Sequence, residues 1–113
     1  MDSSITEEQR IVCDQVRRFA QRELGKGVRD RDRSQTFERE IWRRCGDIRL
    51  HGLSVPLDYG GAGLDALSTA LALESLGVAC EDGGLAFSIC AHLLACTVPI
   101  HLYGSEAQRQ TWL

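Results

Sequence analysis

The stretch Leu85-Ala-Phe-Ser-Ile-Cys-Ala-His-Leu-Leu-Ala-Cys96 is apolar on almost every side when it is placed on a helix. Asp82 and two glycines precede it and form a turn signal. A helix without a charged face belongs in the interior of a protein. We therefore expect the helix Leu85–Cys96 to be the buried centre of a larger helical assembly.

At the start of the chain, a capping box predicts the first helix. In Thr6-Glu-Glu-Gln9, the threonine hydroxyl and the glutamine side chain can each satisfy a free backbone N–H. Apolar residues at spacings of three and four then form one stripe as far as Leu24, and Gly25 is expected to end the helix. The first helix is thus predicted over Glu7–Leu24. The alternating charges of Arg29–Arg33 are typical of a solvated connector, so we expect a linker there.

A second helix and a long loop follow the expected linker. Thr36 can cap this helix, and Gly46 is expected to end it. Its apolar stripe consists of Phe37, Ile41 and Cys45. The stretch Leu50–Leu64 contains one proline and four glycines, which exclude a regular helix and disfavour a central strand. We expect it to be the main loop of the fold.

A third helix, Ala66–Leu76, is predicted between the loop and the apolar stretch. Asp65 can cap it, and Gly77 is expected to end it. Its inward-facing residues are expected to be Leu67, Ala70, Leu71 and Leu76. No segment of the chain alternates polar and apolar residues in the way a strand does. The sequence therefore predicts an all-α fold of five to six helices in an orthogonal or up-down arrangement.

Two short helices are predicted near the end of the chain. Pro99 suits the first turn of one that stops at Gly104. A second capping box, Ser105-Glu-Ala-Gln108, then opens a helix of which Gln108–Leu113 remains. Because so short a helix is not stable alone, its apolar side chains need a surface to pack on. We expect the chain to be the first segment of a longer protein or the partner of another chain.

Length, composition and charge narrow the classes of protein. The 113 residues are 43% hydrophobic and 26% charged, which is ordinary for one globular domain. No apolar run approaches the roughly 18 to 20 residues of a membrane span, so none is expected. A net charge of −3 argues against a nucleic-acid partner. The first residues lack a secretory signal and the 5 cysteines form no CxxC pair, so we expect free thiols and a cytoplasmic location.

Two patterns around the loop are similar to cofactor sites but lack a necessary part. Gly61–Ala66 matches the GxGxxA form of the dinucleotide fingerprint, but Pro56 interrupts the strand that this motif needs. Gly63–Leu67 is similar to the prosthetic-group site of acyl carrier proteins, but Ala66 stands where the modified serine would be. Neither cofactor is therefore expected on this loop.

The remaining polar residues do not predict a metal or catalytic site. A possible metal-binding set consists of Cys90, His92, Cys96 and His101. Structural zinc needs four ligands in recognisable pairs, so satisfied core residues explain this set better. Glu74 has no obvious catalytic partner and is expected to be a hydrogen-bonded structural carboxylate. We assign no catalytic and no metal-binding residue.

Several blocks occur along the chain in a fixed order. They are Thr6-Glu-Glu-Gln-Arg10, Val16-Arg-Arg-Phe-Ala20, Glu23-Leu24, Phe37-Glu-Arg-Glu-Ile-Trp42, His51-Gly-Leu-Ser-Val-Pro56, Tyr59-Gly-Gly-Ala-Gly-Leu-Asp65, Glu74, Ala91-His92 and Tyr103-Gly-Ser-Glu-Ala-Gln-Arg-Gln-Thr-Trp-Leu113. In this order they resemble the amino-terminal domain of the acyl-CoA dehydrogenase family, over essentially the whole chain. The Val-Pro-x-x-Tyr-Gly-Gly-x-Gly block and the Gly-Ser-Glu-x-Gln block are the most specific combination.

The resemblance implies that residues 1–113 form the helical amino-terminal domain of an enzyme whose middle β-domain and carboxy-terminal helical domain are absent here. Family enzymes are oxidoreductases of lipid metabolism, commonly homotetramers, that bind FAD. They remove hydrogen from the α and β carbons of an acyl-CoA or acyl-carrier thioester. The catalytic glutamate and most flavin contacts belong to the other domains. The resemblance therefore assigns no catalytic or cofactor-binding residue here and implies a chain that is inactive alone.

The resemblance also implies that the helix Leu85–Cys96 forms one wall of the acyl-chain pocket. Phe87, Ala91 and Ala95 occupy pocket-facing family positions. Their spacing of i, i+4 and i+8 independently places them on one face of a helix. Phe87 is bulky where the two alanines are small, so the depth of the pocket depends on how its ring lies.

Two hypotheses remain open. In the first, the chain is the amino-terminal segment of a flavin-dependent acyl-thioester dehydrogenase and contributes a pocket wall and an assembly surface. In the second, it is a non-catalytic helical module that docks on a full-length dehydrogenase. The discriminating feature is the exposure of Ala107, Trp112 and Leu113, because exposed apolar side chains there favour the first hypothesis.

Overall fold

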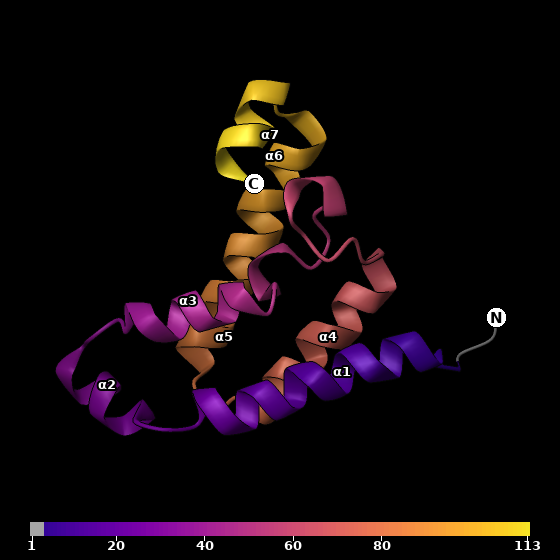
Figure 1. Cartoon of the computed structure of the whole chain (residues 1–113). Helices are drawn as coiled ribbons and strands as arrows, with labels where there is room; N and C mark the ends of the chain where they lie inside the picture. Colours follow the sequence, from indigo (N-terminus) through magenta and orange to yellow (C-terminus); the bar gives the residue numbers. More distant parts are fainter. Residues whose placement is uncertain (1–3) are drawn as a thin grey trace.

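The computed structural model describes residues 4–113, and this part of the chain is helical without any strand (Figure 1). The elements in chain order are α1 (Glu7–Phe19), η1 (Ala20–Leu24), α2 (Val28–Ser34), α3 (Arg39–Asp47), η2 (Leu50–Gly52), η3 (Leu57–Tyr59), α4 (Ala66–Ala79), α5 (Gly83–Ala91), η4 (His92–Thr97), α6 (Val98–Tyr103) and α7 (Glu106–Trp112). The segments α5, η4 and α6 follow one another without a break and form one continuous helix, as do α1 and η1. The described chain therefore has six helices, apart from the two 3-10 turns η2 and η3. The predicted all-α fold is confirmed.

Helices α1 and α4 pack side by side and carry much of the core (Figure 1). The capping box of α1 forms as predicted, because the Gln9 N–H donates to Thr6 Oγ1 at 3.1 Å and the Thr6 N–H donates to Gln9 Oε1 at 3.0 Å. The largest fully buried side chains come from several helices: Leu24, Leu50, Leu76, Ile89, Leu93 and Cys45. The core thus joins residues that are far apart in the sequence.

The prediction of a linker at Arg29–Arg33 is wrong, because these residues form most of helix α2, Val28–Ser34. The first helix does extend to Leu24, through the π-helical turn η1. Gly25 does not supply the left-handed stop; its φ is −81°, whereas Gly27 has a φ of 76° and precedes α2. A segment of alternating charges therefore forms a short helix, and its Arg31 makes ion pairs with Glu38 and Asp82.

The predicted start of the second helix is also wrong. Helix α3 begins at Arg39 after Glu38, and no side chain caps it. Ile41 and Cys45 are buried as predicted, but Phe37 lies before the helix and is 55% exposed. The helix continues past Gly46 for one residue, because glycine is tolerated in a last helical turn.

Helix α4 is longer than predicted and buries a different face. Asp65 caps it as expected, accepting a 2.7 Å hydrogen bond from the Ser68 N–H, but Gly77 lies inside the helix. Of the residues expected to face inward, Leu76 is fully buried, Leu71 is partly buried, and Leu67 and Ala70 are exposed. Thr69 and Ala72 are buried instead. Because this helix is apolar all round, its sequence does not define a single inward face.

We expected no apolar segment long enough to span a membrane, and by length and composition this expectation is wrong. The continuous helix Gly83–Tyr103 has 21 residues and is apolar enough to cross a membrane, and only 22% of its apolar window is buried. Pro99 lies in the first turn of α6, directly after the π-helical segment η4. One such helix is weak support for a membrane span, since the core helix of a soluble protein has the same length and composition.

The main loop, Leu50–Leu64, lacks a regular helix or strand as predicted and contains two single 3-10 turns, η2 and η3. Its backbone folds back on itself: the Gly63 N–H donates to the Val55 carbonyl at 2.9 Å and the Leu64 N–H donates to the Leu53 carbonyl at 2.8 Å. At Gly61, a Cβ would lie 2.1 Å from the Val55 carbonyl oxygen. Only glycine fits this crossing of the loop.

Helices α6 and α7 form an arm at one end of the molecule (Figure 1). The capping box at Ser105 forms as predicted, with its hydroxyl accepting a 3.2 Å hydrogen bond from the Gln108 N–H. No residue after Thr97 is fully buried, and Ala107 and Trp112 are exposed while Leu113 is partly buried. The arm therefore carries apolar side chains that this chain does not cover.

Candidate functional site

The three predicted wall residues lie on the long helix Gly83–Tyr103. Phe87 is 72% exposed, Ala95 is exposed, and Ala91 is partly buried. Phe87 and Ala91 belong to α5, whereas Ala95 belongs to the π-helical segment η4. The added residue per turn in η4 changes the direction of Ala95 relative to a regular α-helix. The sequence pattern did not reveal this π segment.

The opposite side of the same helix is fixed in the core. Leu85, Ile89 and Leu93 are buried, and they follow the same four-residue spacing with an offset of two residues from the predicted wall. Two residues on a helix correspond to roughly 200° of rotation. Burial of this stripe therefore leaves the Phe87 side chain exposed, while Ala91 is partly buried.

A cluster of three rings holds the helix where the π segment begins. The Trp42 and His51 ring centroids are 4.0 Å apart, the Trp42 and His92 rings meet edge to face at 5.6 Å, and the two imidazoles are 5.2 Å apart. Burial, together with the neighbouring His92, lowers the pKa of His51 to about 4. His51 is consequently neutral at pH 7, and its Nε2 is buried without a hydrogen-bond partner.

The polar residues considered as metal ligands are not brought together. Within residues 4–113, no three or more His, Cys, Asp and Glu side chains gather in a geometry that could hold a metal ion. All 5 cysteines are free, and Cys96 is exposed. Burial raises the pKa of the Cys45 thiol to about 11, so this cysteine is inert. Glu74 is exposed on α4, and its role as a hydrogen-bonded structural carboxylate stays a prediction.

The glycine loop does not fit a dinucleotide cofactor such as FAD. A 3-10 turn, Leu57–Tyr59, precedes its glycines instead of a strand. The space beside Gly61 is filled by the chain's own backbone at Val55, so no cradle remains for a pyrophosphate. At the N-terminus of α4, the Asp65 carboxylate already accepts the hydrogen bond that a phosphate would take. The glycine loop and the α4 N-terminus therefore do not fit a pyrophosphate group.

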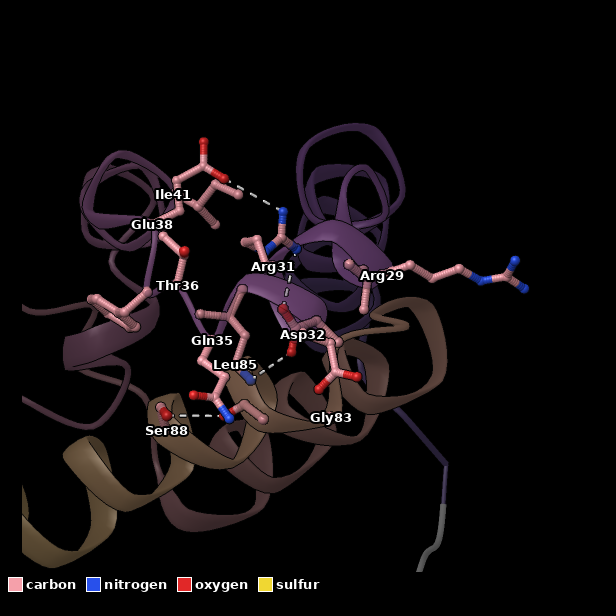
Figure 2. A pocket seen from close by; sticks show the side chains of 14 residues that line it. Arg29, Arg31, Asp32, Gln35, Thr36, Glu38, Ile41, Gly83, Leu85 and Ser88 are labelled. Carbon is pink, nitrogen blue, oxygen red and sulfur yellow. Dashed lines mark hydrogen bonds and ion pairs between the residues drawn. The ribbon is translucent and has the colours of Figure 1, made fainter.

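A groove of about 570 Å³ lies beside the N-terminal end of α5 (Figure 2). It runs between α2, the start of α3 and the first turns of α5, and Leu85 and Ser88 contribute to it while Phe87 does not. Arg31 forms ion pairs there with Glu38 at 3.5 Å and with Asp82 at 3.1 Å. Sequence reasoning missed these contacts, because residues 31 and 82 are brought together only by the fold.

Comparison with known proteins gives consistent matches over the chain. The family model described as "Acyl-CoA dehydrogenase, N-terminal domain" matches residues 6–113. The probable acyl-CoA dehydrogenase YngJ of Bacillus subtilis is 34% identical over 113 residues, covering 100% of this chain and 29% of the relative. An L-prolyl-(peptidyl-carrier protein) dehydrogenase of Pseudomonas fluorescens is 48% identical over 69 residues, covering 61% of this chain and 18% of the relative.

Solved structures agree with these relatives. The prolyl acyl carrier protein oxidase AnaB has a TM-score of 0.90 at 36% identity, with 96% of this chain and 29% of that chain covered. The structure described as "PigA with FAD and proline" has a TM-score of 0.93 at 33% identity, with 100% of this chain and 30% of that chain covered. The chain thus spans less than a third of the length of each of these proteins. It belongs to the acyl-CoA dehydrogenase family, as the amino-terminal helical domain.

Proposed function

We propose that this domain is part of an FAD-dependent acyl-thioester dehydrogenase and supplies one wall of its acyl pocket. The observation that carries the proposal is the division of α5 into two faces. Leu85 and Ile89 anchor one face in the core, while Phe87 is exposed on the other and Ala91 beside it is partly buried. An apolar face that is held rigidly but not covered is suited to a hydrophobic acyl group.

The proposed substrate is a short acyl group on coenzyme A or on a carrier protein. Phe87 is the bulkiest of the proposed wall residues, and its ring would limit the depth of the pocket. Two of the similar proteins are described as acting on prolyl groups attached to a carrier protein. A prolyl ring is compact, so these relatives are compatible with a shallow pocket.

Other parts of the complete enzyme would hold the cofactor and perform the chemistry. PigA, which is similar over 100% of this chain, is described with bound FAD. FAD in a complete enzyme would supply the oxidising power for forming a carbon–carbon double bond. This chain's own part would be to orient the acyl group and exclude water, through the exposed apolar side chain of Phe87. On this proposal the domain is inactive alone.

The exposed apolar surface of the arm supports packing against a further domain or another subunit. Trp112 is 69% exposed and lines one open hollow together with Tyr103, Pro99 and Ile100, and Leu102 on the same arm is 57% exposed. Contiguous apolar side chains of this kind mark interaction surfaces. We propose that the complete protein also contains a middle β-domain and a carboxy-terminal helical domain, and that it forms an oligomer. A cytoplasmic location and a role in lipid metabolism remain predictions that follow from the free thiols and the family.

The non-catalytic docking module is the alternative, and an activity assay separates the two. The complete flavoprotein that carries this domain is incubated with prolyl-carrier, butyryl and octanoyl thioesters and an artificial electron acceptor. We expect acceptor reduction with a short acyl group. Substitution of Phe87 by alanine should raise kcat/KM for octanoyl relative to butyryl thioester by roughly tenfold, because it deepens the pocket.

The control is Leu102→Ala, which removes an apolar side chain of the arm that is 57% exposed, against 72% for Phe87. It should leave the ratio between the two thioesters unchanged. Absence of turnover with every thioester would contradict the proposed function and favour the docking module. Equal loss of activity on all thioesters in Phe87→Ala would contradict the pocket wall alone.

A further inference from the structure

Arg31 joins three separate segments of the chain, although the sequence places it in a run of alternating charges. Its side chain is only 13% exposed. Nη1 donates to the Lys26 carbonyl at 2.6 Å and lies 3.5 Å from Glu38 Oε2, while Nη2 donates to Asp82 Oδ2 at 3.1 Å (Figure 2). The guanidinium therefore connects the turn before α2, the start of α3 and the turn before α5.

Asp82 uses its two carboxylate oxygens for two different purposes. Oδ1 accepts a 3.0 Å hydrogen bond from the Leu85 N–H and so caps the first turn of α5. Oδ2 accepts the hydrogen bond from Arg31. Because the same carboxylate makes both contacts, the position of α2 and the position of the α5 N-terminus are linked through one side chain. Charge-assisted hydrogen bonds of this kind are stronger and more directional than neutral ones.

The two hydrogen bonds of the Asp82 carboxylate act on the part of α5 that contains Phe87. Phe87 lies in the second turn of α5, five residues after Asp82. Ala95 lies beyond the start of the π segment, where the rings of Trp42 and His92 hold the helix independently. A shift of the α5 N-terminus would therefore move Phe87 more than Ala95. The two ends of the proposed wall have separate supports.

We infer that Arg31 and Asp82 are positioning residues that fix the place of Phe87 and thereby tune which acyl groups the enzyme accepts. This inference rests on the proposed function, since it needs Phe87 at the pocket. Neither side chain contacts the acyl group; both act through the backbone of α5. A displacement of a binding group by about 1 Å is enough to change rates substantially.

Arg31 differs from the other arginines of α2, which are ordinary solvent-exposed charges. Arg29 and Arg33 lie on the same helix and are exposed, and the Arg29 side chain points away from the other labelled residues (Figure 2). Exposed charges of this kind contribute little to stability or geometry. Arg29 is therefore a matched control on the same helix.

The test uses three variants of the complete flavoprotein. Arg31→Gln removes the charge and the fork of donors, and Asp82→Asn removes the ion pair but keeps a good helix cap, because asparagine caps as well as aspartate. Arg29→Gln is the control. We expect the ratio of kcat/KM between octanoyl and butyryl thioesters to change by about fivefold to tenfold in the first two variants. Arg29→Gln should stay within about twofold of the wild type.

A second readout does not depend on activity. Backbone hydrogen exchange is measured over the first two turns of α5 and over η4 in the same proteins. Arg31→Gln and Asp82→Asn should speed exchange around Leu85–Phe87 and leave η4 unchanged. Unchanged exchange at α5, or a uniform loss of activity on both thioesters, would overturn the inference. An enzyme inactive on every thioester would refute the proposed function and, with it, the role of the pair in selectivity, whichever way the exchange results fall.

Discussion

The described chain divides at Thr97 into a packed part and an arm. Up to that residue, each long helix contributes side chains to the core, whereas α6 and α7 beyond it contain no buried residue. One continuous helix, Gly83–Tyr103, crosses the boundary and is apolar on both sides of it. Leu93 is fully buried before the boundary, and Leu102 is 57% exposed after it. Apolar composition alone therefore does not determine burial; the presence of a neighbouring element does.

The largest effect should come from removing a core side chain and comparing it with the same change on the arm. Leu76→Ala should lower the free energy of unfolding by about 2–5 kcal/mol, because it leaves a cavity against α1. Leu102→Ala should change it by less than about 0.5 kcal/mol. Denaturant unfolding followed by circular dichroism measures both. Similar losses in the two variants would show that the arm is packed in solution.

A second test contrasts two glycines in the packed part. Gly61→Ala should cost roughly 2–4 kcal/mol, because the new Cβ would clash with the Val55 carbonyl oxygen. Gly77→Ala should stabilise the protein by about 0.5–1 kcal/mol, since nothing lies within 4 Å of its Cβ and alanine is the better helix former. The same unfolding assay measures both changes. Opposite signs are the expected result; two losses would mean that α4 is covered at Gly77.

The third test concerns the ring cluster at the start of the π segment. The pKa of His51 is about 4 in the folded protein against an ordinary value of 6.5, so between these pH values only the unfolded chain binds the proton. The stabilisation is complete above about pH 6.5 and is lost as the pH falls towards 4. We expect a loss of roughly 2 kcal/mol over this range, discounted for partial exposure.

His51→Phe keeps a ring stacked against Trp42 but cannot bind a proton. In this variant the free energy of unfolding should fall less between pH 6.5 and 4 than in the wild type. A series of urea unfolding curves at different pH values measures the difference. An identical pH dependence in both proteins would show that His51 does not carry the effect.

The smallest effect should come from the contact that ties the arm to the main loop. Tyr59 Oη donates to Glu106 Oε2 at 2.8 Å on the surface. Tyr59→Phe should therefore cost only about 0.5 kcal/mol and speed hydrogen exchange in α7 by about twofold. Tyr103→Phe is the control, because Tyr103 is on the arm and highly exposed. Equal effects of the two changes would contradict a specific role for the hydrogen bond between Tyr59 and Glu106.

Local signals in the sequence predicted several features correctly. The capping boxes at Thr6 and Ser105 and the Asp65 cap depend only on residues within one helical turn, and all three form. The glycine-rich loop was also recognisable, since Pro56 and its glycines exclude regular elements. These predictions succeeded because the physics that decides them is local.

Several predictions that required a neighbouring element were wrong. Helix α2 was expected to be a linker, because nothing near Arg31 in the sequence shows that Asp82 will accept its hydrogen bond. The inward face of α4 was misassigned at Leu67 and Ala70, because an apolar helix offers several faces and the partner α1 selects one. The partial burial of Ala91 and the π turn after it likewise depend on packing.

The sequence by itself determined the helical class, the caps at Thr6, Asp65 and Ser105, the loop and the family of this protein, because these caps, turns and motif spacings are encoded over short distances. The tertiary structure alone decided which apolar faces are buried, where Phe87 points and which charges pair with Arg31. Burial and ion pairing depend on residues that are distant along the chain, and hydrophobic energy has no direction of its own. Only the assembled helices supply that direction.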